Sequence, residues 1–197
     1  MGTINRCIQD ILKYWNECWK YAVLTAGVVC FAAIMIRLYR KKSGAEIESV
    51  KSFMYKLLFL FCDSIYLTYS FYVTFGMRYV GERQEVQWIP FADVWNNPGE
   101  IPLLIENILL FIPFGLLAPL TSYRFRSRKV ILIGAVITSF CIEALQYVFR
   151  CGKTEVDDVI LNSIGGMMGY GLFSILWNKK ERIKEGNLNT KIVKDGK

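Results

Sequence analysis

The sequence has no histidine, which removes a common metal ligand and a common general base. Its six cysteines lie far apart and form no CxxC pair of the kind that begins a zinc site. We interpret them as isolated thiols, because a disulfide framework belongs to small secreted domains with a different composition. The sequence therefore predicts no metal site and no cofactor.

Negative charge is also scarce. The chain carries 17 acidic and 24 basic residues, which gives a formal net charge of +7. A positive excess can indicate nucleic-acid binding, but these lysines and arginines flank long apolar runs and do not alternate with aromatic residues on one face. Positive flanks are typical of membrane-spanning helices. We therefore predict no nucleic-acid partner.

Apolar residues, by contrast, are abundant. The 197 residues are 53% hydrophobic and 15% aromatic, a composition typical of small integral membrane proteins. Several apolar runs are long enough to cross a hydrocarbon core of about 30 Å as a helix. The sequence predicts an all-α integral membrane protein with about five transmembrane helices, over residues 21–39, 53–75, 103–120, 130–149 and 158–177.

The two ends of the chain differ from this central part. Residues 1–20 place Ile4, Ile8 and Trp15 at helical spacing among polar residues, which predicts an amphipathic interfacial helix. A plain leader turn before the first span is the alternative. Residues 21–177 form the predicted membrane domain, and residues 178–197 a basic, cytoplasmic and largely disordered tail. The basic loops predict a multi-pass protein of the bacterial cytoplasmic membrane. They favour an amino terminus outside, but Arg6, Lys13 and Lys20 would then lie outside against the same rule, so the orientation of this end stays open.

Polar residues interrupt the predicted spans. At about 100° per residue, two sets each fall on one helix face: Ser139, Glu143, Gln146 and Arg150, and then Asp158, Asn162, Gly165 and Gly169. A carboxylate at the middle of a span costs about 2.5 to 3.5 kcal/mol, so these faces should point into the bundle or a wet cavity. Gly165 and Gly169 have the small-xxx-small spacing that lets another helix approach closely. Asp63 is a further candidate, either functional or a structural partner of another helix.

Depth brings the polar residues of three spans together. Asn107, Glu143 and Asn162 lie four to six residues inside the outer ends of their spans. At 1.5 Å per residue, this places them about 6 to 9 Å below the outer interface. Asp158 and Arg150 lie at the rim. The sequence therefore predicts a polar pocket in the outer leaflet, whereas a conduction path would need polar groups along the whole depth.

The spacing of these residues resembles a known family. The relevant positions are Glu143, Gln146, Arg150, Asp157, Asp158, Asn162, Gly165, Gly169 and Tyr170, together with the upstream segments 89–91 and 107–115. This combination resembles the signature of the VanZ-like family of small bacterial membrane proteins, over roughly residues 20 to 177. Two departures are Trp88, where the family often has asparagine, and the linker 151–153.

The resemblance implies a phenotype but no chemistry. The family's named member is associated with resistance to teicoplanin, a glycopeptide antibiotic with a lipid tail. A similar role is expected here, with a membrane lipid or a lipid-linked cell-wall precursor as partner, and a lipoglycopeptide antibiotic as a further candidate. The ligand-binding candidates are Asn107, Glu143, Gln146, Arg150, Asp157, Asp158 and Asn162.

Three other interpretations stay open at this stage. The polar residues could form an inter-helix hydrogen-bond network that only fixes the fold. The protein could instead be an enzyme acting on a lipid or isoprenoid headgroup, with Glu143 as general base and Asp157 with Asp158 holding a divalent cation. Finally, the surface formed by Gly165, Gly166 and Gly169 could bind another membrane protein.

Overall fold

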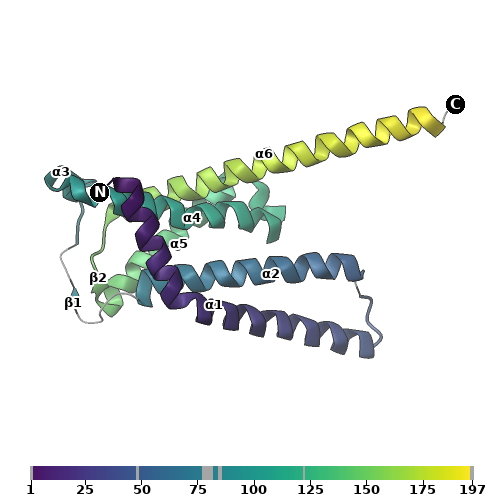
Figure 1. Cartoon of the computed structure of the whole chain (residues 1–197), viewed down its shortest axis with the longest axis horizontal. Helices are drawn as coiled ribbons and strands as arrows, with labels where there is room; N and C mark the ends of the chain where they lie inside the picture. Colours follow the sequence, from purple (N-terminus) through teal and green to yellow (C-terminus); the bar gives the residue numbers. More distant parts are fainter. Residues whose placement is uncertain (1, 48, 77–81, 84–85, 122, 196–197) are drawn as a thin grey trace. The chain divides into compact units, whose positions relative to one another are not determined.

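The computed structural model describes residues 2–47, 49–76, 82–83, 86–121 and 123–195, and nearly all of them are helical (Figure 1). Among these residues, five helical segments are long and apolar enough to span a membrane: Thr3–Lys42, Val50–Gly76, Pro98–Thr121, Arg128–Phe149 and Val156–Lys179. The predicted all-α fold with five membrane-spanning helices is therefore confirmed.

The long helices are α1 (Thr3–Lys42), α2 (Val50–Phe71), α4 (Ile101–Thr121), α5 (Arg128–Phe149) and α6 (Val156–Asp195). Shorter elements are the π-helix η1 (Tyr72–Gly76), α3 (Ala92–Asn96), and the 3-10 helices η2 (Pro98–Glu100) and η3 (Tyr123–Arg126). The two-residue strands β1 (Glu82–Arg83) and β2 (Cys151–Gly152) pair in parallel. The chain divides into two compact units, Met1–Glu85 with Gln146–Lys153, and Val86–Leu145 with Thr154–Lys197.

In the first unit, α1 and α2 pack as an antiparallel hairpin (Figure 1). The hydroxyls of Thr25 and Thr68 are 2.7 Å apart. Further along, the Cys30 thiol donates a hydrogen bond to the Leu57 carbonyl over 3.6 Å. Thr25 contacts Thr68, whereas the later residue Cys30 contacts the earlier residue Leu57. The two helices therefore lie side by side and run in opposite directions.

The sequence divided residues 1–20 from the first span, but the structure has one helix here. α1 runs without a break through that boundary, although Figure 1 shows it changing direction part-way along its length. Continuity has a local cause, because residues 17–24 contain neither proline nor glycine to end a helix. The interfacial position of the first twenty residues stays a prediction.

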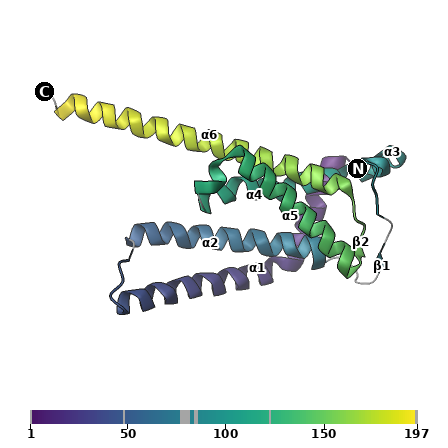
Figure 2. The same cartoon turned by 180° about the vertical axis from the view of Figure 1, so that it is seen from behind.

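In the second unit, glycines bring α4 and α6 into backbone contact. Figures 1 and 2 show the two helices side by side. A Cβ at Gly165 would collide with the carbonyl oxygen of Ile108, and one at Gly169 with that of Ile112. Only hydrogen fits at these points. The close approach is the arrangement that the small-xxx-small spacing allows.

This contact changes the adaptor interpretation. That hypothesis required the glycine surface of α6 to face a separate protein. In the structure, α4 covers Gly165 and Gly169, while a Cβ at Gly166 would meet the Ala135 side chain of α5 at 3.0 Å. The glycine surface packs against α4 and α5 of the same chain. The adaptor hypothesis was therefore wrong that this surface is exposed to another protein.

α5 packs against α6 through apolar side chains at the end of the second unit opposite the α5–α6 loop. Ile131 of α5 forms a buried cluster with Tyr170 and Phe173 of α6. The Tyr170 hydroxyl donates to the carbonyl of Arg126, just before α5, over 2.7 Å. A buried tyrosine needs such a partner, since an unpaired hydroxyl in an apolar environment is costly.

The carboxyl-terminal tail was predicted to be largely disordered from residue 178, and the structure contradicts this. α6 continues as a helix to Asp195. Residues 178–197 include six lysines, which have good helix propensity. Because the preceding span has already nucleated the helix, each added residue only has to propagate it.

Candidate functional site

Asp158 links all three long helices of the second unit. It lies in the first turn of α6 and accepts a hydrogen bond from the Asn107 side-chain amide of α4. Its backbone carbonyl accepts a hydrogen bond from the Ser139 hydroxyl of α5 over 3.3 Å. A carboxylate in the first helical turn also gains from the helix macrodipole. The Asp158 carboxylate is therefore stabilised by the amino-terminal end of α6 and by the Asn107 amide of α4.

Asp157 holds a loop rather than a helix. Asp157 is only 3% exposed, and both of its carboxylate oxygens lie 2.9 Å from the backbone nitrogen of Phe91, which donates to them. Phe91 has a φ of 60°, a left-handed conformation that costs a bulky residue on the order of 1–3 kcal/mol. The charged acceptor compensates for part of that cost.

A short backbone ladder holds the same loop. The Gln87 amide donates to the Thr154 carbonyl over 2.9 Å, and the Val156 amide donates to the Gln87 carbonyl over 3.3 Å. The segment 88–90 follows, and its Trp88 and Ile89 are exposed. The start of α6 thus fixes an apolar segment through both a bridge and the Asp157 side chain.

Glu143 and Asn162 lie at two successive levels between α5 and α6. Glu143 is 5% exposed and accepts a hydrogen bond from the Glu155 backbone amide over 3.1 Å. One turn further from the α5–α6 loop, the Asn162 side-chain amide donates to the Ser139 hydroxyl over 2.8 Å. Polar residues predicted to share one depth are therefore staggered by about one helical turn.

Gln146 and Arg150 belong to the first unit. Gln146 is 1% exposed and donates to the carbonyl of Thr74 in η1 over 3.1 Å. Arg150 follows the last residue of α5, has a φ of 53° and is exposed. The predicted stripe on α5 is thus buried at Glu143 and Gln146 but does not extend to Arg150, because the helix has already ended.

In the second unit, the side-chain oxygen of Asn162 and the hydroxyl of Thr154 are buried and have no hydrogen-bond partner among the residues that the structure describes. Buried polar atoms normally pair with protein or water, so these two atoms have hydrogen-bonding capacity that the described residues do not use. Thr154 was not among the candidates, since a threonine in a polar loop gives no sequence signal.

The two aspartates do not act as a pair. Asp157 binds the Phe91 amide, whereas Asp158 binds the Asn107 side chain. Within the described residues, no group of three or more cysteine, aspartate or glutamate side chains is placed to hold a metal ion. The geometry does not bring Asp157 and Asp158 onto the shared divalent cation that the enzyme hypothesis requires.

Several hydrogen-bonding groups of the site could not be predicted from the sequence. The amides of Phe91 and Glu155 and the carbonyl of Thr74 are backbone groups, which every residue offers. Ser139 lay on the predicted polar face of α5 but was not a ligand candidate. Its burial beside Asn162 could have been found from the stripe, because a serine there needs a polar partner on the next helix.

Fold and site together define a multi-pass helical membrane protein with a polar cluster buried among the ends of α4, α5 and α6. The sequence model of the VanZ/LLP1 family matches residues 53–177, more than half of the chain. The chain belongs to the VanZ/LLP1 family, and the resemblance found in its motifs is confirmed.

A curated relative is similar over a shorter stretch. It is named Protein VanZ, from Enterococcus faecium, and is 33% identical over 88 residues. The match covers 42% of this chain and 53% of the relative, so the chain spans about half the length of that protein. No solved structure matches the chain significantly.

Proposed function

We propose that this protein is a membrane factor that lowers the susceptibility of its host to lipidated glycopeptide antibiotics of the teicoplanin type. It acts from the bacterial cytoplasmic membrane, at the outer leaflet, by binding the polar headgroup of a lipid, a lipid-linked cell-wall precursor or the antibiotic itself. The observation that carries the proposal is the buried polar cluster of a VanZ/LLP1 family member. The mechanism needs binding and no chemical step.

The burial of acidic side chains supports a functional role. Glu143 lies within a predicted span and is almost fully buried, and the surrounding helices are apolar. Inter-helix hydrogen bonds in membranes stabilise a fold by only about 0.6 kcal/mol on average. A carboxylate at the middle of a span costs more than that, about 2.5 to 3.5 kcal/mol. A gain in stability is therefore a weak explanation for a carboxylate at this position.

Unused hydrogen-bonding capacity supports a ligand. The Asn162 oxygen is a buried acceptor and the Thr154 hydroxyl can donate or accept, and neither has a partner among the described residues. Hydroxyl-bearing or amine-bearing headgroups supply the donors that such atoms lack. Gln146 and Arg150 remain candidates on sequence grounds, with Arg150 an exposed cation suited to an anionic group.

The apolar segment next to the cluster supports a lipidated ligand. Trp88 is 74% and Ile89 is 68% exposed, and both precede the Phe91 amide that Asp157 holds. Tryptophan is enriched at the membrane interface, where its ring is amphipathic. A rigid aromatic segment beside polar groups would favour a molecule that combines a headgroup with an acyl chain.

The contacts also support the purely structural interpretation, and an experiment separates the two. Wild-type protein, Glu143→Gln and Glu46→Gln are expressed in a sensitive Gram-positive host at equal membrane levels, and susceptibility to teicoplanin and vancomycin is measured. Glu46 is an exposed glutamate and serves as the matched control. We expect wild type and Glu46→Gln to protect several-fold against teicoplanin, with less effect on vancomycin, and Glu143→Gln to lose the protection.

The thermal stability of the purified variants completes the comparison. Glutamine keeps the oxygen that accepts the Glu155 amide, so Glu143→Gln should unfold near the wild-type temperature. Full protection by Glu143→Gln would contradict the role of the cluster. If Glu143→Gln loses both the protection and much of its thermal stability, the structural interpretation is favoured. If the wild-type protein does not protect the host from teicoplanin, the proposal is refuted.

A further inference from the structure

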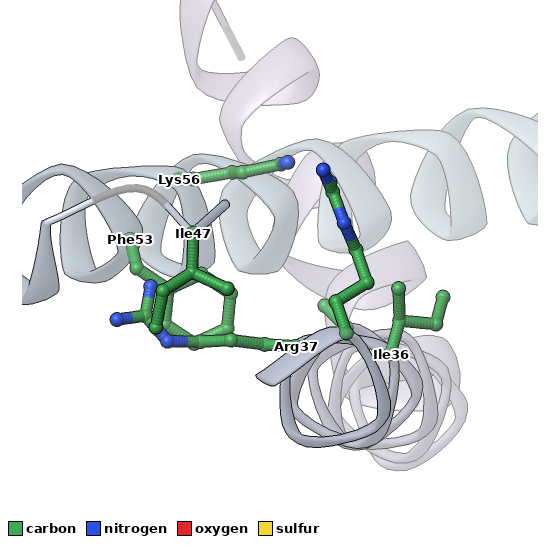
Figure 3. A pocket seen from close by; sticks show the side chains of 7 residues that line it. Ile36, Arg37, Ile47, Phe53 and Lys56 are labelled. Atoms are coloured by element: carbon green, nitrogen blue, oxygen red, sulfur yellow. The ribbon is translucent and has the colours of Figure 1, made fainter. Parts of the chain in front are cut away.

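The structure contains a second polar feature, at the loop end of the α1–α2 hairpin in the first unit. A hollow with a volume of about 50 Å³ opens there between the two helices. This is several times the roughly 10–15 Å³ that a single water requires. Three cations line it, Arg37 and Arg40 from α1 and Lys56 from α2 (Figure 3).

Arg37 has the strongest need for a ligand. Its guanidinium lies over the Phe53 ring, 4.4 Å from the ring centroid, and Figure 3 shows the two stacked. This contact fixes the guanidinium plane but leaves its N–H groups to find acceptors. The Nη1 atom is buried and has no hydrogen-bond partner among the described residues. A buried charged donor without an acceptor is costly, so an acceptor that reaches Nη1 would stabilise Arg37.

The other two cations make the hollow positive. Arg40 uses one nitrogen to donate to the Glu46 backbone carbonyl over 3.4 Å, which leaves its remaining donors for other acceptors. Lys56 lines the same hollow from the opposite helix. Arginine forks match phosphate oxygens in a bidentate manner, and lysine adds a point charge.

The walls indicate where the anion comes from. Ile36, Ile47 and Phe53 line the hollow together with the cations. Beyond it, α1 and α2 expose apolar side chains along their membrane-spanning lengths, such as Met54 and Leu58. A soluble anion gains nothing from such walls, whereas a lipid places its headgroup among the cations and its acyl chains along the helices.

We propose that this hollow binds the phosphate of an anionic membrane lipid, on the side of the membrane where the basic end of α1 lies. Arg37 supplies the principal hydrogen bonds, and Arg40 and Lys56 supply further positive charge. Basic clusters at helix ends attract anionic lipid on the cytoplasmic side, the side that the positive-inside pattern assigns to this loop. The residues that line this hollow belong to the first unit, whereas Asn107, Glu143 and Asp158 belong to the second.

The test measures lipid binding to the purified full chain in neutral detergent, by native mass spectrometry and thermal unfolding. Phosphatidylglycerol is compared with zwitterionic phosphatidylcholine and with inorganic phosphate. We expect phosphatidylglycerol to bind and stabilise the wild-type chain. Arg37→Gln should weaken that binding about tenfold, because it removes a charge-assisted hydrogen-bond donor set.

Lys42→Gln is the matched control, since it removes one positive charge from the same helix at an exposed residue that does not line the hollow. It should bind phosphatidylglycerol like wild type. Equal weakening in both variants would overturn the proposal in favour of diffuse surface charge. Equal stabilisation by inorganic phosphate would overturn the lipid assignment. If Arg37→Gln does not fold, Arg37→Lys is the alternative variant. It keeps the positive charge but loses the bidentate guanidinium, so it should still bind phosphatidylglycerol more weakly than wild type.

Discussion

Gly169→Val should unfold the second unit or destabilise it by roughly 3 kcal/mol or more. The new Cβ would collide with the Ile112 carbonyl oxygen and lie 3.0 Å from the Leu116 amide nitrogen. Both atoms belong to the backbone of α4, so neither can move aside by changing rotamer. The helices would have to separate, and the packing between α4 and α6 would be lost. Thermal unfolding of the purified protein in detergent measures the effect.

Gly171 is the matched control for this substitution. It lies two residues further along α6, and a Cβ there would meet no atom within 4 Å. Gly171→Val should change the free energy of unfolding by no more than about 0.5 kcal/mol, because a substitution into open space rarely has a larger effect. Similar unfolding temperatures for the two variants would show that close contact at Gly169 does not support the fold.

Asp157→Ala should release the segment that contains Trp88 and Ile89. The Phe91 amide would lose its charged acceptor, and the left-handed backbone at Phe91 would lose the contact that stabilises it. Hydrogen bonds to charged groups contribute about 1.5–3 kcal/mol. Hydrogen exchange of a peptide covering residues 86–96 should therefore become about 10- to 100-fold faster, as measured by mass spectrometry.

Asp157→Asn provides the graded comparison. The asparagine oxygen can still accept the Phe91 amide, but without a negative charge, so its exchange rate should fall between those of wild type and Asp157→Ala. Peptides from α2, in the other unit, serve as the internal reference and should not change. An unchanged rate for residues 86–96 in Asp157→Ala would mean that the Gln87 bridge alone holds the loop.

These results bear on how a cluster of this kind works. Asp157 and Asp158 are adjacent and both acidic, yet one holds a loop and the other holds α4. Loss of antibiotic protection in Asp157→Ala would indicate that protection depends on the position of the segment that contains Trp88 and Ile89. Loss in Glu143→Gln would report on the polar cluster between α5 and α6. Comparing the two separates a role in presenting a lipid-facing segment from a role in binding a headgroup.

The spans and their polar faces could be predicted from residue order alone. Apolar run length defines a spanning helix, and helical periodicity put Glu143 and Gln146 on one face, where both are buried. The same rule failed at Arg150, because a periodic pattern does not show where the backbone leaves the helix. The tail beyond residue 178 was also mispredicted, since polar composition distinguishes a solvated helix poorly from a disordered segment.

The sequence by itself determined the class of protein, the order of its membrane helices, the glycine spacing on α6 and the family, because composition and periodicity are local properties. Only the tertiary structure decided the partners. In the structure, the Phe91 amide donates a hydrogen bond to Asp157 and the Glu155 amide donates one to Glu143. Gln146 donates one to the Thr74 carbonyl. Every residue carries the same backbone groups, so no residue type marks which of them will face a buried side chain once the helices pack.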